Sequence, residues 1–206
     1  MFYFQYNRYL IGGVLLVAAL VVLGIVYSAG KSEEEAEAGA QLRKVQQLVQ
    51  QQQYKLAIEG DPAQGIPGLK NISETYGSTV SGTTATMLLG SCYLNTEQFD
   101  LALQAFDHAS PSNDLMSSNI LDGKAAAYEG KKQFAEAAEF YEKAAATFNN
   151  DFLQANRYFH AARAWALAGD KAKAYAAVEK VKEAKTPRFE KDVERLINQY
   201  QLEVAE

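Results

Sequence analysis

The longest apolar stretch of the chain lies near its start and gives way abruptly to acidic residues. Residues 10–27 read LIGGVLLVAALVVLGIVY, and SAGKSEEEAEAG follows. A helix of this length spans about 27 Å, close to the hydrocarbon thickness of a bilayer. No polar side chain interrupts residues 10–26, whereas a helix of a soluble core is usually apolar on one stripe. The pattern predicts a transmembrane helix over residues 10–29 behind a cytoplasmic tip over residues 1–9.

Two alternatives stay open for this stretch. A cleaved signal peptide would share the positive start at Arg8 and the small residues Ser28 and Gly30 near a cleavage point. The length of the apolar run and the aromatic residues around Tyr6 that precede it favour a retained anchor. A core helix of a soluble protein is the least favoured interpretation. With Arg8 before the span and glutamates after it, the bulk of the chain is expected outside the cytoplasm.

Farther along the chain, small and apolar positions recur at an interval of 35 to 37 residues. Each unit has an aromatic residue, a small residue three positions before it, and an alanine nine positions after it. Small residues suit the close crossing of two helices, and the aromatic residues fill the space between neighbouring hairpins. The aromatic, small and alanine positions are Tyr93, Tyr128 and Trp165; Gly90, Ala125 and Ala162; and Ala102, Ala137 and Ala174.

This spacing resembles the tetratricopeptide repeat, a helix-turn-helix unit. Repeats are predicted over residues 83–116, 118–151 and 155–188, with a divergent one over residues 40–80. Thr186 and Pro187 form a good helix start, so a capping helix is predicted over residues 187–203. The predicted fold class is therefore all-α: one amino-terminal transmembrane helix, then a right-handed α-solenoid of tetratricopeptide repeats over residues 30–206, closed by the capping helix.

Composition and motifs exclude several function classes. The chain has 20 basic and 25 acidic residues, and no basic stripe interleaved with aromatic residues, so no nucleic-acid partner is expected. Cys92 is the only cysteine, and His108 and His160 stand 52 residues apart, so neither an internal disulfide nor a metal site is predicted. Nucleophile, phosphate-loop and dinucleotide motifs are absent from the sequence. We expect no enzyme, no cofactor and no small-molecule substrate.

As a whole, the chain resembles the YfgM-type ancillary subunits of the SecYEG translocon. The resemblance rests on the amino-terminal span and on the segments YKLAIEGDPAQGIPGLKNISETYGST, LLGSCYL and ALAGDKAKAYAAVEKV. It implies a single-pass protein of the bacterial inner membrane, held in the bilayer by Leu10 to Ala29, with its repeat domain in the periplasm. The implied partners are the Sec translocon and a periplasmic chaperone or emerging polypeptides. A scaffold of another envelope complex, such as cell division, is the alternative function.

The repeat register also predicts which residues would contact a partner. The first helix of each hairpin lines the groove of such a stack. The residues at these positions are mixed and weakly charged, which favours an apolar or helical segment of a protein partner. Ordinary solvated helix surface explains each of them equally well. The candidates are Thr84, Met87, Ser91, Asn119, Asp122, Asn156, Phe159 and Arg163.

Overall fold

The structure, a computed structural model, describes residues 28, 30–184 and 186–202 and is almost entirely helical there. A helix over residues 30–50, here called the N-terminal helix, comes first. It is followed by α2 (Tyr54–Glu59), α3 (Leu69–Tyr76), α4 (Val80–Asn95), α5 (Phe99–His108), α6 (Asp114–Gly130), α7 (Phe134–Thr147), α8 (Asp151–Ala168), α9 (Lys171–Glu183) and α10 (Glu190–Tyr200).

A small hairpin interrupts the helices between α2 and α3. Its strands β1 (Gly60–Asp61) and β2 (Ile66–Pro67) are antiparallel and pair Gly60 with Pro67. A 3-10 turn over Pro62–Gln64 joins them, and the Asp61 carboxylate accepts hydrogen bonds from the Ala63 and Gln64 amides. The glycines and prolines of this segment thus divide the first helical region.

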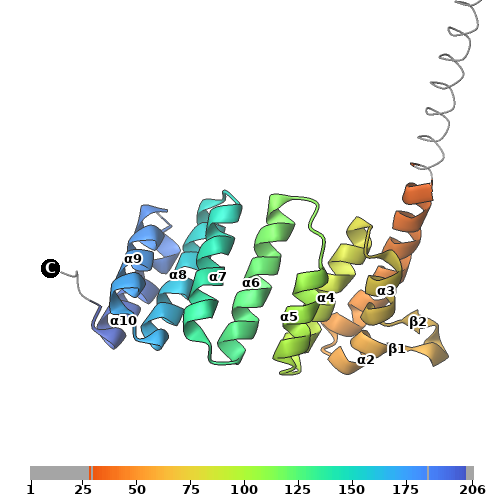
Figure 1. Ribbon diagram of the computed structural model, residues 1–206, viewed down its shortest axis with the longest axis horizontal. Coiled ribbons are helices and arrows are strands. Elements are labelled where there is room, and N and C mark those ends of the chain that lie inside the picture. The colour runs from red at the N-terminus through yellow and green to blue at the C-terminus, as the bar shows by residue number, and fades with distance from the viewer. Residues whose placement is uncertain (1–27, 29, 185, 203–206) are drawn as a thin grey trace, which may run out of the picture.

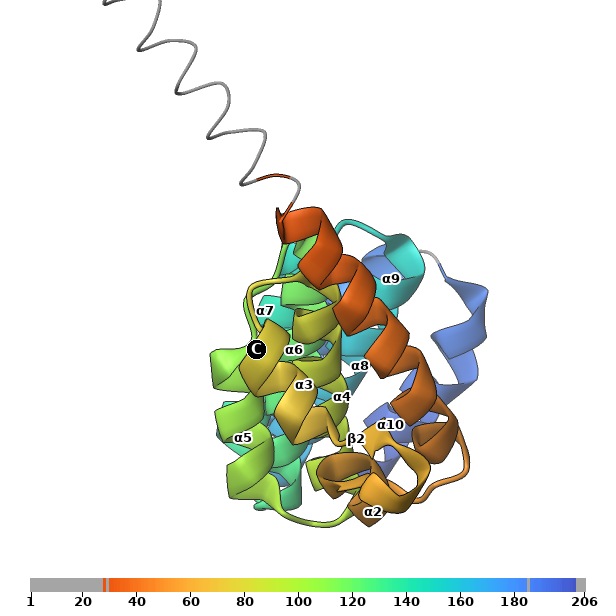
Figure 2. The ribbon, with the colours of Figure 1, turned by 90° about the vertical axis from the view of Figure 1, so that its right-hand side faces the viewer.

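The helices stand side by side in an elongated row (Figure 1). The pairs α4–α5, α6–α7 and α8–α9 are helical hairpins, with the N-terminal helix at one end of the row and α10 at the other. Figure 2 views the row from the end where the N-terminal helix crosses in front of the others. What the structure shows is an all-helical domain, and its arrangement is compatible with a helical solenoid.

The three hairpins have helix caps and turn residues at equivalent positions. One polar residue directly precedes the first helix of each hairpin: Thr79 before α4, Asn113 before α6 and Asn150 before α8. Its side chain accepts a hydrogen bond from a backbone amide of the first helical turn, at 2.9, 2.9 and 3.0 Å respectively. Such side-chain caps satisfy amides that have no partner inside the helix. The turns within the hairpins place Glu97, Lys132 and Gly169 in the left-handed region. These three turn residues repeat with the same spacing as the aromatic positions.

The core consists of two apolar clusters that meet at α6. One extends from Ala38 of the N-terminal helix to α6, where Ile120 and Ala127 belong to it. The other begins with Ala125 on α6 and continues through α10 to Leu202. Because α6 buries side chains into both clusters, it joins the two halves of the row.

The N-terminal helix is held to α4 by Glu35. Its carboxylate accepts hydrogen bonds from the Ser81 amide, at 3.2 Å, and from the Ser81 hydroxyl, at 2.6 Å. Ser81 lies in the first turn of α4, where the helix dipole favours a negative charge. One member of the acidic run therefore caps a helix distant in sequence.

The predicted membrane topology has to be corrected. Within the part of the chain that the structure describes, no helix is both long enough and apolar enough to cross a membrane. The predicted fold class with a spanning helix, and the single-pass inner-membrane localisation that followed from it, are overturned by this finding. The stretch over residues 10–27, on which the prediction rested, lies outside the described residues.

The start of the last helix also differs from the prediction. The Thr186 hydroxyl donates a hydrogen bond to the Ala184 carbonyl, at 3.2 Å, and does not cap the helix. Pro187–Phe189 form a 3-10 turn, and α10 begins at Glu190. Val193 and Leu196 of α10 are buried in the second cluster.

Candidate functional site

The predicted contact residues of the first hairpin lie on one face of α4 and are half-buried. The Thr84 hydroxyl donates to the Val80 carbonyl at 2.8 Å, and the Ser91 hydroxyl donates to the Met87 carbonyl at 3.0 Å. Both hydroxyls are thus used within their own helix. Met87 packs against the first apolar cluster.

The predicted residues of the second hairpin are brought together by a buried arginine of α8. Arg157 Nε donates to Asp122 Oδ2 at 2.6 Å, and Arg157 Nη2 donates to Asn119 Oδ1 at 3.0 Å. The Arg157 side chain is only 2 % exposed, whereas that of Asp122 is 33 % exposed. A buried guanidinium needs a charged partner, because removing it from water alone is costly. We call Asn119, Asp122 and Arg157 the arginine cluster.

A second charged contact joins the same two helices. Arg163 Nη2 of α8 donates to Glu129 Oε1 of α6 at 2.6 Å, and the Tyr141 hydroxyl of α7 donates to Glu129 Oε2 at 3.1 Å. The His160 ring stacks on Tyr141 with centroids 5.3 Å apart. Burial raises the pKa of the Tyr141 hydroxyl, and the Glu129 charge adds to this. Burial lowers the pKa of His160, and the nearby Arg163 charge lowers it further.

The two contacts leave polar atoms buried without a partner among the described residues. These atoms are Asp122 Oδ1, Arg157 Nη1, Arg163 Nε and His160 Nδ1. Buried polar atoms are normally paired with protein or with ordered water. The interface of α6 and α8 therefore retains capacity for further hydrogen bonds.

The remaining two candidates on α8 have different surroundings. The Phe159 ring packs 6.0 Å from the Phe189 ring and 6.0 Å from the His160 ring, as part of the second cluster. Asn156 is half-buried on α8. Phe159 therefore contributes to the core, whereas Asn156 belongs to neither apolar cluster.

Sequence reasoning missed Arg157, Glu129, Tyr141 and His160. Glu129 follows Asp122 by seven residues, which places both on one helix face and was a usable signal. Arg157 gave no such signal, because an arginine beside Asn156 is ordinary for an exposed helix surface.

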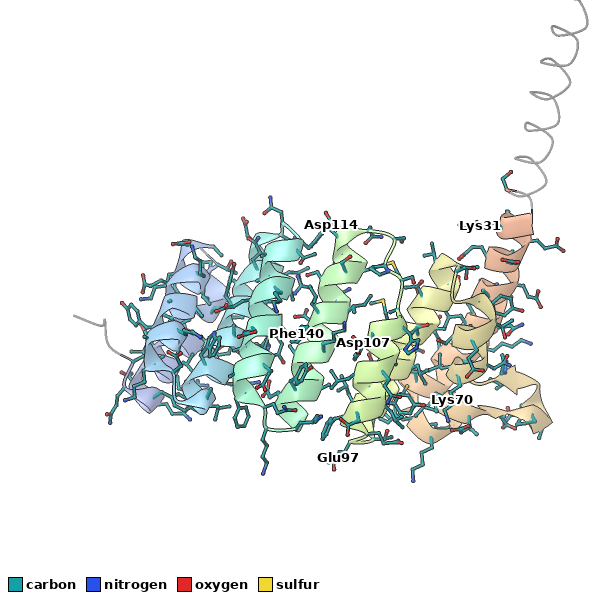
Figure 3. All side chains as sticks on the ribbon, in the orientation of Figure 1. Lys31, Lys70, Glu97, Asp107, Asp114 and Phe140 are labelled. Atoms are coloured by element: carbon teal, nitrogen blue, oxygen red, sulfur yellow. The ribbon has the colours of Figure 1, made fainter. Side chains whose placement is uncertain are left out.

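The structure also contains a groove on the opposite face of α4. It has a volume of about 490 Å³ and lies among α3, α4 and α5. Thr86, Leu89 and Tyr93 contribute from α4, and at about 100° per residue they point away from Thr84, Met87 and Ser91. None of the predicted contact residues lines this groove. Lys70 marks its α3 side in Figure 3.

Metal and thiol chemistry find little support in the described part of the chain. There, no three histidine, cysteine, aspartate or glutamate side chains converge on a point where a metal ion could bind. Cys92 is buried, and burial raises the pKa of its thiol to about 11. A thiol that stays protonated at neutral pH is a poor nucleophile.

Comparisons with known proteins identify no relative of this chain. No family model matches the chain, and neither a curated protein nor a solved structure matches it. The resemblance to translocon subunits therefore stays a hypothesis.

Proposed function

We propose that the protein is a non-catalytic adaptor that binds a segment of another protein across α6 and α8. The observation that carries the proposal is the pair of charged contacts between these helices, Asp122–Arg157 and Glu129–Arg163. They fix partly exposed polar groups of two hairpins in one arrangement. Fixed groups lose little conformational entropy when a partner binds.

The exposed fractions of these side chains support binding at this face. Asp122 is 33 % exposed, Glu129 24 % and Arg163 37 %, so each can still meet a partner while held by its own contact. The unpaired Asp122 Oδ1 and Arg157 Nη1 are themselves buried, so a partner meets the exposed parts of Asp122, Glu129 and Arg163. A polypeptide backbone offers both donors and acceptors and matches these carboxylate and guanidinium groups.

The first partners to test are components of the secretion translocon and a chaperone, as the family resemblance implies. A photo-crosslinking amino acid at Asn156 on α8 would report contacts at the proposed face in cells that produce the protein. The matched control is the same amino acid at Glu97. Figure 3 places Glu97 at the edge of the row opposite Asp114, where α6 begins.

We expect crosslinks to translocon or chaperone peptides from Asn156 and none from Glu97. Crosslinks to another complex alone would reject these partners in favour of a scaffold of that complex. Equal crosslinks from both positions would reject the proposed face.

A further inference from the structure

Three exposed apolar side chains occupy the same position in the three hairpins. Val80 at the start of α4 is 51 % exposed, Leu115 at the start of α6 40 % and Phe152 at the start of α8 41 %. They follow one another at the interval of the repeat aromatic residues. Among the large apolar side chains of the described residues, only Leu101 and Leu167 are otherwise exposed to this extent. Scattered exposed apolar residues are ordinary, whereas a position that repeats in every hairpin indicates a shared surface. We call Val80, Leu115 and Phe152 the apolar row.

The apolar row borders the proposed binding face. On α6, Leu115 precedes Asn119 by four residues and Asp122 by seven, so the three share one side of the helix. On α8, Phe152 precedes Asn156 by the same four residues. Both apolar side chains therefore lie one helical turn before a predicted contact residue, toward the edge where these helices begin.

The border of the apolar row at the starts of α6 and α8 is acidic. An exposed aspartate directly precedes each apolar side chain there, Asp114 on α6 and Asp151 on α8. Neither aspartate makes an ion pair within the residues that the structure describes. Figure 3 labels Asp114 at the edge of the domain. The Arg188 guanidinium lies 5.5 Å from the ring centroid of Phe152 and supplies one positive charge nearby. The two carboxylates thus outnumber the cation on this border.

At its α4 end, the apolar row meets a hollow of about 480 Å³. Val80 and Thr83 line this hollow together with residues of the loop before α6. Lys31 and Glu35 of the N-terminal helix also line it and carry opposite charges. At this end, an apolar residue of a partner therefore finds space as well as a surface.

We infer that a basic amphipathic helix of the partner docks along the apolar row. Its apolar side chains pack on Val80, Leu115 and Phe152, and its lysine or arginine side chains face Asp114 and Asp151. An amphipathic helix presents one apolar stripe with polar residues on both sides of it. This matches a row bounded by aspartates on one side and by the polar contact positions on the other. The inference names the chemistry of the partner segment, so it rests on the proposed adaptor function.

The test uses a library of random peptides several helical turns long, selected on the full chain and then measured individually by fluorescence titration. We expect selected peptides to carry apolar residues at intervals of three and four, flanked by lysine or arginine. Their affinity should fall roughly tenfold on Leu115→Ser and on Phe152→Ser, the order expected when a buried apolar contact is lost. Leu167→Ser is the matched control, because Leu167 is 40 % exposed at the other end of α8, and it should leave affinity unchanged. Asp114→Asn/Asp151→Asn should weaken binding at low salt and less at high salt.

The same peptides separate the apolar row from the adaptor face and from folding. The Phe152 ring also lies 5.7 Å from the Phe189 ring, so Leu115→Ser decides the test if Phe152→Ser is less stable. Peptides that bind both serine variants of the apolar row like wild type, but lose affinity on Arg163→Ala, would overturn the apolar row and leave the adaptor function intact. Peptides that bind all of these variants like wild type would overturn both, as would failure to select any peptide.

Discussion

The ring of Phe106 on α5 lies directly against the backbone of Gly123 on α6, with no space for a Cβ atom between them. The same ring faces Gly90 on α4, where a Cβ atom would come within 2.7 Å of it. Phe106 is 3 % exposed. One side chain therefore sets how closely two successive hairpins approach.

Substituting either glycine should destabilise the domain through this ring. We expect Gly90→Leu and Gly123→Leu each to lower the free energy of unfolding by about 1–3 kcal/mol, the usual cost of overpacking. Urea unfolding followed by circular dichroism measures the change. Adding Phe106→Leu should recover part of the loss in a double-mutant cycle. An unchanged melting temperature for Gly90→Leu would contradict the close crossing.

At the hairpin turns, by contrast, substitution to glycine should stabilise the domain. Glu97 and Lys132 have φ values of 58° and 60°, whereas the third hairpin has Gly169 in this place at 85°. Side chains with a Cβ atom pay a steric cost in this region that glycine avoids. Glu97→Gly and Lys132→Gly should each raise the free energy of unfolding by roughly 0.5–1 kcal/mol. Thermal unfolding measures this, with Gly169→Ala as the reciprocal control that should lose stability.

Removing the arginine of the arginine cluster should cause a large loss of stability, and a second substitution should reverse it. Arg157→Met leaves Asp122 without its partner and should cost about 2–4 kcal/mol, because breaking a buried ion pair strands a charge. The double variant Arg157→Met/Asp122→Leu removes both charges and should recover most of the loss. Chemical unfolding of the three proteins tests this. If the double variant were less stable than the single one, the cluster would owe its stability to something other than charge pairing.

Glu35 predicts a pH dependence of stability. Burial raises the pKa of its carboxyl, but the hydrogen bonds from the Ser81 side chain and backbone outweigh this, and the net shift is downward from 4.5. The ionised form therefore stabilises the folded protein above the unfolded-state pKa. That contribution is lost as pH falls through the lowered folded-state pKa.

Glu35→Gln should accordingly be less stable than wild type at neutral pH, by about 1 kcal/mol, the typical worth of a helix cap. Unfolding measured between pH 7 and acid, about pH 3, should show the two proteins converging as the carboxyl protonates. Glu33→Gln, in the same acidic run, serves as the control. A difference that stays constant over this range would contradict the cap.

The repeat interval was enough to predict the helical hairpins because it reflects packing that recurs in each unit. The spacing of Tyr93, Tyr128 and Trp165 also relates the turn residues Glu97, Lys132 and Gly169. Residues whose role depends on a neighbouring helix were not predictable. The burial of Arg157 depends on where α6 carries Asp122, and no periodicity within α8 shows it.

The open groove escaped prediction for a related reason. Its lining residues come from α3, α4 and α5, and only the packing of these helices brings them together. The membrane topology failed differently, because it rested on apolar length at residues 10–27, and the helices that the structure describes contain no such segment.

Binding across α6 and α8 is the central claim, and calorimetry on one variant tests it most directly. A synthetic peptide with the sequence crosslinked at Asn156 is titrated into wild type and into Arg163→Ala. Removing Arg163 leaves Glu129, which is 24 % exposed, without its ion-pair partner, so the melting temperature of the variant is measured as well and the titration is carried out well below it. We predict that the peptide binds Arg163→Ala at least about tenfold more weakly, since a charged hydrogen bond is lost. Equal affinity for the two proteins would contradict the claim.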